Sequence, residues 1–299
     1  MHSYGYRLAA LGLFLVGAAA AQPPTGPGPA PAPQPGATQA SQPGATQTSQ
    51  PGATQAAQPG AIPAAQPGAT AASQPGGRSS PQPAANLSGF PWQNETLHYV
   101  MNWQSGLPVG EVNFTARKME RGGWSLEVAG NAGVLGFAVN DRYRSTTGAD
   151  LCSIELLRET DHAGRKGTEK STFDQKTGAG HRVTLLPKDG GETDFFIGPC
   201  ARDAVAFAYF ARMELGQGRV PASAQTYLGA AYSTSMVYTG AQDIVVDGKK
   251  VTTDRLNVAV KGPKADFHFE VAYARDPART PMQIRVPLSM GTFTLDLVR

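Results

Sequence analysis

Acidic residues are absent from the first 85 positions of this 299-residue chain, where Arg7 and Arg78 are the only basic residues. The same stretch holds 15 of the 24 prolines. The rest of the chain carries 24 basic and 23 acidic residues, a net charge of +1. Because positive and negative charges nearly cancel, this region has no strong positive electrostatic field. The sequence pI of 8.8 is therefore no argument for nucleic-acid binding.

Long hydrophobic runs are also missing. The apolar segment Leu8–Gly17 has ten residues, and no later segment reaches 18, so neither suits a helix that must cross ~30 Å of hydrocarbon. Arg7 precedes this segment and the small residues Ala19–Ala21 follow it, which is typical of a secretory signal peptide. We therefore predict a signal peptide at residues 1–21, a mature chain without a transmembrane helix, and a periplasmic or secreted location.

Residues 22–85 have almost nothing to bury. Gln-Pro-Gly recurs every eight residues, at positions 34, 42, 50, 58, 66 and 74, and Ile62 is the only large aliphatic residue in the stretch. Such composition is typical of a disordered Pro/Gly/Gln/Ala-rich spacer. The simpler interpretation is a tether that keeps its domain mobile. The alternative is a ligand for a partner in the cell envelope.

Residues 86–299 alternate between apolar and polar side chains, which predicts strands. Val112, Phe114 and Ala116 alternate with polar neighbours, and Asp247-Gly248 separates two alternating runs as a hairpin turn does. About a dozen such segments are joined by connections too short for helical crossovers. We predict a single, mainly β domain with one large curved antiparallel sheet, an open or partly closed barrel.

One segment departs from this alternation. Arg202–Leu215 is rich in alanine, with Asp203 as a candidate N-cap and Gly216 as a stop signal. We predict one main α-helix here, packed on the concave side of the sheet. Its aromatic residues either fill the core, which is the usual role of such a stripe, or form a lid over an apolar cavity.

The chain has only two cysteines, Cys152 and Cys200. An even number in an exported protein favours a disulfide, which would connect the start of the helix to the strand that begins near Leu151. The alternative is a reactive thiol with a nearby histidine, but no Cys-His-Asn signature is visible. We predict the disulfide.

Catalytic and cofactor motifs are lacking. The sequence has no G-x-S-x-G, no P-loop and no dinucleotide-binding fingerprint, and its histidines are not spaced as metal ligands. Asp141–Arg144 and Arg275–Arg279 place arginine beside aspartate, which favours local ion pairing or capping over an anion-binding rim. We predict no catalytic residue, no cofactor and no metal ion.

Large apolar side chains are expected to gather on the concave face. If the helix closes this face, the gathered side chains form an apolar pocket. The alternative is that they fill one another's space as a packed core. The predicted pocket residues are Tyr99, Met101, Trp103, Phe114, Trp124, Phe207, Phe210 and Met213.

Four segments carry a resemblance to a known family: ETLHYVMNWQSGLPVGEV, CARDAVAFAYFAR, IVVDGKKVTTDRLNV and DPARTPMQIRVPLSMGTFTLDLVR. From about Glu95 to Arg299 the chain resembles the bacterial domain-of-unknown-function family 3108. The resemblance implies export and a β-rich fold. It implies no activity, cofactor or catalytic residue.

Three classes of function remain. The first is a periplasmic binding or carrier module for an apolar or lipid-like ligand. The second is a structural or interaction protein of the cell envelope that uses residues 22–85 as a spacer. The third is a hydrolase of envelope polymer, which ranks last because no catalytic constellation is visible. The sequence favours a non-catalytic protein.

Overall fold

The computed structural model describes residues 82–83, 91, 93–134, 137–246, 248–263, 266–288 and 291–298. The predicted signal peptide, and all of the predicted spacer except residues 82–83, lie outside these residues. No helix in the described part of the chain is both long enough and apolar enough to span a membrane.

The described residues form fifteen strands and one helix. Before the helix come β1 (Glu95–Trp103), β2 (Pro108–Lys118), β3 (Trp124–Val134), β4 (Phe137–Thr147), β5 (Ser153–His162), β6 (Arg165–Asp174), β7 (Ala179–Leu186), β8 (Glu192–Phe196) and β9 (Arg202–Asp203). The helix α1 (Ala204–Gly216) is followed by β10 (Ala224–Tyr227), β11 (Ala231–Val246), β12 (Lys249–Lys261), β13 (Asp266–Ala274), β14 (Pro281–Leu288) and β15 (Gly291–Val298).

All fifteen strands belong to one sheet, in the order β8-β7-β6-β5-β4-β3-β2-β1-β15-β14-β13-β12-β11-β10-β9. Neighbouring strands are antiparallel except β9 and β10, which run parallel. This pair departs from the predicted all-antiparallel meander because α1 connects the two strands, and a parallel pair needs such a crossover. The sheet is not closed into a barrel, since β8 and β9 stand at opposite ends of the strand order.

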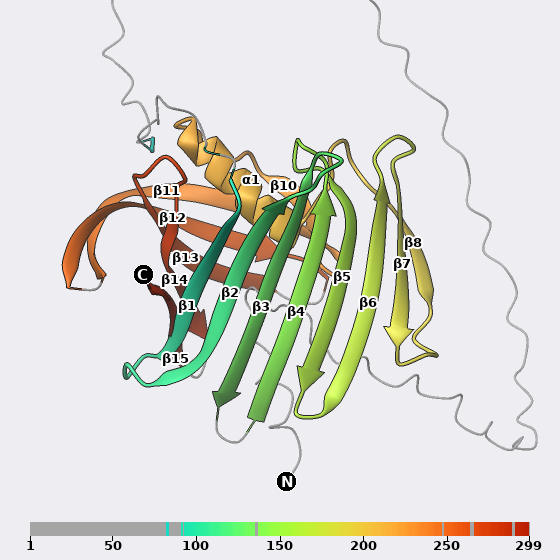
Figure 1. Cartoon of the computed structure of the whole chain (residues 1–299), viewed down its shortest axis with the longest axis horizontal. Coiled ribbons are helices and arrows are strands. Elements are labelled where there is room, and N and C mark those ends of the chain that lie inside the picture. Colours follow the sequence, from blue (N-terminus) through green and yellow to red (C-terminus); the bar gives the residue numbers. More distant parts are fainter. Residues whose placement is uncertain are drawn as a thin grey trace, which may run out of the picture. The chain divides into compact units, whose positions relative to one another are not determined.

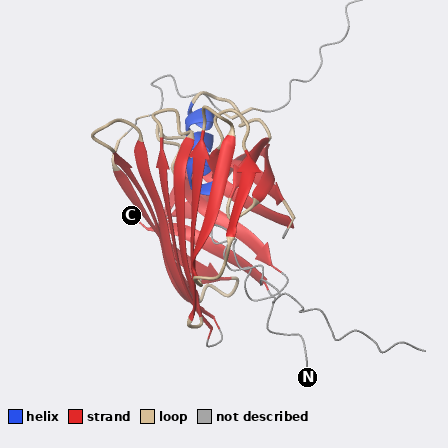
Figure 2. Cartoon of the chain, turned by 90° about the vertical axis from the view of Figure 1, so that its right-hand side faces the viewer, coloured by secondary structure: helices blue, strands red, loops and turns tan. Residues whose placement is uncertain are grey.

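The sheet curls around the helix. Figure 1 shows α1 between the strands β2–β5 in front and β11–β13 behind, and Figure 2 shows the same arrangement from the side. Bulges help the sheet to bend. In β11 the register with β12 shifts between Tyr238 and Gly240, where Gly240 has a φ of +121°. The predicted helix on the concave side is therefore confirmed.

Alternation places the apolar side chains on the concave face. Tyr99 and Met101 in β1 are buried, as are Val112 and Phe114 in β2. The rings of Tyr99 and Phe114 pack edge to face, with their centroids 5.3 Å apart. The helix boundaries also agree with the prediction, apart from Arg202 and Asp203, which form β9. The structure has fifteen strands where about a dozen alternating segments were predicted, and β11 is a single strand of 16 residues.

Candidate functional site

The start of α1 is fixed by a buried carboxylate. Asp203 is the N-cap, and its Oδ1 accepts hydrogen bonds from the backbone N–H groups of Val205 at 2.9 Å and Ala206 at 3.0 Å. Its Oδ2 accepts from the hydroxyls of Ser145 in β4 at 2.5 Å and Ser153 in β5 at 2.6 Å. Burial raises the pKa of Asp203 above its ordinary value, and these hydrogen bonds oppose the rise.

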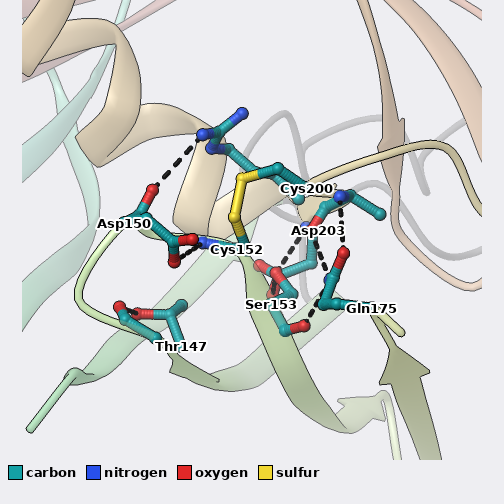
Figure 3. Close-up of a disulfide and its surroundings, with 10 residues drawn as sticks. Thr147, Asp150, Cys152, Ser153, Gln175, Cys200 and Asp203 are labelled. Carbon is teal, nitrogen blue, oxygen red and sulfur yellow. Dashed lines mark hydrogen bonds between the residues drawn. A yellow bond between two sulfur atoms is a disulfide. The ribbon is translucent and has the colours of Figure 1, made fainter.

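The predicted disulfide lies beside this N-cap. Cys152 and Cys200 are bonded, with their Cα atoms 4.7 Å apart (Figure 3), a separation usual for disulfides. Gln175 donates to the carbonyls of Ser153 at 2.7 Å and Ala201 at 3.1 Å. The segment that enters the helix is therefore held against β5 both covalently and by hydrogen bonds.

The second half of the helix is held by an ion pair. Arg212 is 3% exposed at its side chain and binds the carboxylate of Glu95 in β1 through both terminal nitrogens, with Nη2 to Oε2 at 3.0 Å. Its Nε donates to the carbonyl of Ala278 at 3.0 Å. Because α1 also packs on β3, β4, β9 and β10, both ends of the helix are fixed against the sheet.

An apolar cavity of about 90 Å³ lies between α1 and the strands that follow it. Its lining comes from the helix and from β10 to β13, with Leu228 between β10 and β11. The lining residues are Ala204, Val205, Phe207, Ala208, Ala211, Thr226, Leu228, Tyr232, Thr234, Met236, Val258, Val260, Phe267, Phe269, Val271 and Tyr273. The hydroxyls of Thr226 and Thr234 are hydrogen-bonded to each other at 2.7 Å. The cavity wall is therefore almost wholly apolar.

The cavity follows from the pattern of small residues on the helix. Ala204, Ala208 and Ala211 recur at the spacing that aligns side chains on one helical face, and all three line the cavity. Methyl groups cannot reach the facing strands, where Phe267 and Phe269 are themselves only half-buried. A space between the helix and β13 is the result.

The predicted pocket residues do not form one site. Phe207 lines the cavity, whereas Tyr99, Met101, Phe114 and Trp124 are buried in the core of β1–β3. The other three are half-buried. Trp103 contacts Phe293, with ring centroids 4.7 Å apart, and the ring centroid of Phe210 lies 3.7 Å from the guanidinium carbon of Arg202. Met213 is on the helix but does not line the cavity.

The prediction missed the strands that build most of the cavity wall. Phe267 and Phe269 in β13 alternate with polar residues in the sequence, and Tyr232 and Met236 in β11 are four residues apart, on one face of their strand. That alternation identifies them as inward-facing. It does not identify which inward-facing strands lie opposite the small face of the helix, because that depends on how far the sheet curls.

The Asp/Arg clusters pair with distant residues, which corrects the predicted local ion pairs. In the first cluster Arg142 binds Glu127 at 3.6 Å and Arg144 binds Glu159 at 2.8 Å, both across strands. In the second, the fully buried carboxylate of Asp254 binds Arg275 at 2.8 Å and Arg279 at 2.7 Å. The predicted capping does occur at Asp276, which accepts from the Thr280 backbone N–H at 2.9 Å.

Among the described residues, one group of potential metal ligands gathers closely, Asp150 with Cys152 and Cys200. Both sulfur atoms are bonded to each other in the disulfide. A cysteine binds a metal ion as its free thiolate. This group therefore does not form a metal site while the disulfide is intact.

Residues 98–298 match the family described as "Protein of unknown function (DUF3108)". No curated protein matches the chain. Among solved structures, a β-barrel-like protein of the domain of unknown function DUF1849 from Brucella abortus is similar in fold, with a TM-score of 0.51 and 10% identity over 69% of this chain and 96% of that chain. A putative lipoprotein from Parabacteroides distasonis has a TM-score of 0.28 and 8% identity, over 70% and 95% of the two chains.

Proposed function

We propose a function for this chain from the premise that it belongs to the DUF3108 family, whose function is unknown. The chain is an exported, non-catalytic binding or carrier module for an apolar, lipid-like ligand. The apolar cavity between α1 and β10–β13 carries this proposal. Ligand sites are concave and mostly apolar, with few polar groups, and this cavity fits that description.

The proposed export rests on two independent features. Residues 1–21 have the charge, apolar run and small residues of a cleaved signal peptide. The disulfide between Cys152 and Cys200 suits an oxidising compartment such as the periplasm. In this proposal residues 22–85 are a flexible spacer that gives the binding domain reach within the envelope.

The size of the cavity limits what can enter. About 90 Å³ is less than the roughly 150 Å³ of an engineered core cavity that binds benzene. The cavity therefore accepts the end of an alkyl chain rather than a whole lipid. The remaining carbon atoms of the alkyl chain would lie along the half-buried side chains of Ala208, Phe267 and Phe269.

The second candidate is an interaction protein of the envelope. Phe196 in the end strand β8 is 94% exposed, and Ile154 nearby is 50% exposed. These two side chains line a groove of about 470 Å³ on the sheet together with Asp174, His181 and Asp194. An exposed phenylalanine beside the edge of a sheet is suited to contact another protein.

The test is binding of the neutral single-chain alcohol decanol to the folded mature protein, measured by isothermal titration calorimetry, because a narrow alkyl end suits a cavity of this size. We expect saturable binding. Ala208→Leu puts three more carbon atoms into the cavity and should abolish binding. Ala222→Leu is the matched control, because Ala222 is exposed, and should bind as the wild type does. Equal binding by both variants would contradict the cavity as the site and favour the interaction protein.

A further inference from the structure

Charged side chains converge on the backbone of Gly229, directly beside the apolar cavity. Gly229 follows Leu228, which lines the cavity. Arg182 donates through Nη1 to the Gly229 carbonyl. Gly229 has a φ of +67°, and a Cβ atom there would overlap Arg158 Nη1 and lie 3.0 Å from Glu169 Oε2. Glycine is therefore needed at this position, both for its backbone conformation and for the approach of the guanidinium.

Arg158 has a hydrogen-bond donor that the fold does not use. Its side chain is 7% exposed and pairs with Glu169 through Nη1, and its guanidinium carbon lies 5.8 Å from the ring centroid of Tyr143. Its Nε is buried and has no hydrogen-bond partner among the described residues. A buried donor without an acceptor is unfavourable, and an acceptor oxygen supplied by a ligand would satisfy it.

The charge at this end of the cavity is positive. Arg158 and Arg182 contribute two positive charges, and Glu169 contributes one negative charge. The carboxylate of Asp141 in β4 is already bound by the Tyr143 hydroxyl at 3.0 Å and by His162 Nε2 at 2.8 Å.

Tyr232 connects the charged groups to the apolar cavity. Its side chain lines the cavity. Tyr232 follows Gly229 by three residues and is the second residue of β11. Burial raises the pKa of its hydroxyl, Arg158 lowers it and Glu169 raises it. The cavity therefore has an apolar interior and, at the Tyr232 end, a positively charged neighbourhood.

We propose that the ligand is a single-chain amphiphile with an anionic head. Oxygen atoms of the head accept hydrogen bonds from Arg158 Nε and from the guanidinium of Arg182, which is only half-buried. The alkyl chain passes Tyr232 and ends in the cavity. Carboxylate and phosphate heads share this chemistry, since both match the planar donors of arginine. This inference rests on the proposed function and specifies its ligand.

The first experiment compares head groups on the mature full-length protein. Decanoate, decyl phosphate, decanol and decyltrimethylammonium are each titrated into the protein by isothermal titration calorimetry, below their micellar concentrations. We expect the two anions to bind about tenfold more tightly than decanol, because hydrogen bonds to charged groups are stronger than those between neutral groups. Preference for one anion over the other identifies a fatty acid or a phosphate ester as the natural class.

Equal affinity for all four compounds would overturn the anionic head and leave the proposed function standing. Absence of saturable binding of any of the four compounds to the wild type would overturn both. These outcomes separate a failure of the inference from a failure of the function on which it rests.

The second experiment tests the arginines. Arg182→Gln should weaken the binding of decanoate about tenfold and leave the binding of decanol unchanged. Arg158→Gln combined with Glu169→Gln removes a buried charge pair without leaving one charge alone, and should have the same effect. Arg117→Gln is the matched control, because Arg117 is an exposed arginine in β2. Equal weakening of decanoate and decanol, or an effect of Arg117→Gln as large as that of Arg182→Gln, would overturn the assigned head-group site.

Discussion

The two flanks of α1 are built in different ways. Toward β1, β4 and β5 the helix is fixed by the Asp203 network, the disulfide beside it and the Arg212–Glu95 ion pair. Toward β10–β13 the contact is apolar and incomplete, and a cavity of about 90 Å³ remains. A helix that merely filled the core would pack on both sides. Here directional bonds determine its position, so the other side can stay open without the helix moving.

Removing the disulfide should have the largest effect on the fixed flank. Cys152 and Cys200 are 48 residues apart in sequence. We expect the double variant Cys152→Ser/Cys200→Ser to lose about 2–5 kcal/mol of free energy of unfolding, since the cross-link restricts the unfolded chain. Urea denaturation measures this loss. Reduced wild-type protein is the control and should unfold at the same urea concentration as the variant. An unchanged free energy of unfolding would show that the hydrogen bonds alone hold this flank.

The same substitution at two neighbouring positions should separate the flanks. Ala206 is 0% exposed and does not line the cavity, whereas Ala208 does. Ala206→Leu should cost about 1–3 kcal/mol by overpacking. Ala208→Leu should cost nothing or stabilise the protein slightly, because the added carbons fill existing space. Thermal or urea unfolding of both variants checks the comparison. Equal destabilisation by the two would show that the cavity flank is as tightly packed as the other.

The smallest expected effect is a change in how stability depends on pH. The pKa of Asp203 is raised, first by burial. A carboxyl group with a raised pKa contributes stability below its unfolded pKa of about 3.9, and this contribution is lost as the pH rises through the folded value. The stability of the wild type relative to Asp203→Asn should therefore fall as the pH is raised from about 4 to about 7.

Asp174 is the control of opposite sign. Its pKa is lowered, first by the backbone N–H of Lys176 and then by Thr177. The wild type should lose its advantage over Asp174→Asn as the pH falls below about 4. Denaturation midpoints at several pH values measure both trends. The same sign for Asp203 and Asp174 would contradict the assigned burial of Asp203.

Local signals made much of the fold predictable. Alternation identified the inward-facing strand residues such as Tyr99 and Phe114, and Asp203 followed by an alanine-rich run identified the helix and its N-cap. Both signals act within a few residues, so a linear sequence contains them in full. The two cysteines were predicted to pair because their number and the predicted export left few alternatives.

The candidate site was predictable only in part. Of the helix residues assigned to a pocket, Phe207 lines the cavity, whereas Phe210 and Met213 do not. Apolar residues lie on more than one face of this helix. The sequence does not indicate which of these faces lines a cavity. The parallel β9–β10 pair was missed as well, because β9 has only two residues and no periodic signal of its own.

The sequence by itself determined the composition of the parts: an N-terminal region without acidic residues, a β-rich domain, one capped helix and a pair of cysteines. Each depends on local pattern or on composition, which folding does not alter. Only the tertiary structure decided that Ala204, Ala208 and Ala211 face β13 across an empty space, and that Arg158 and Arg182 meet at Gly229 beside it. Arg158 and Gly229 are 71 positions apart in the chain, and the curl of the sheet, a collective result of many strand pairs and bulges, brings them together.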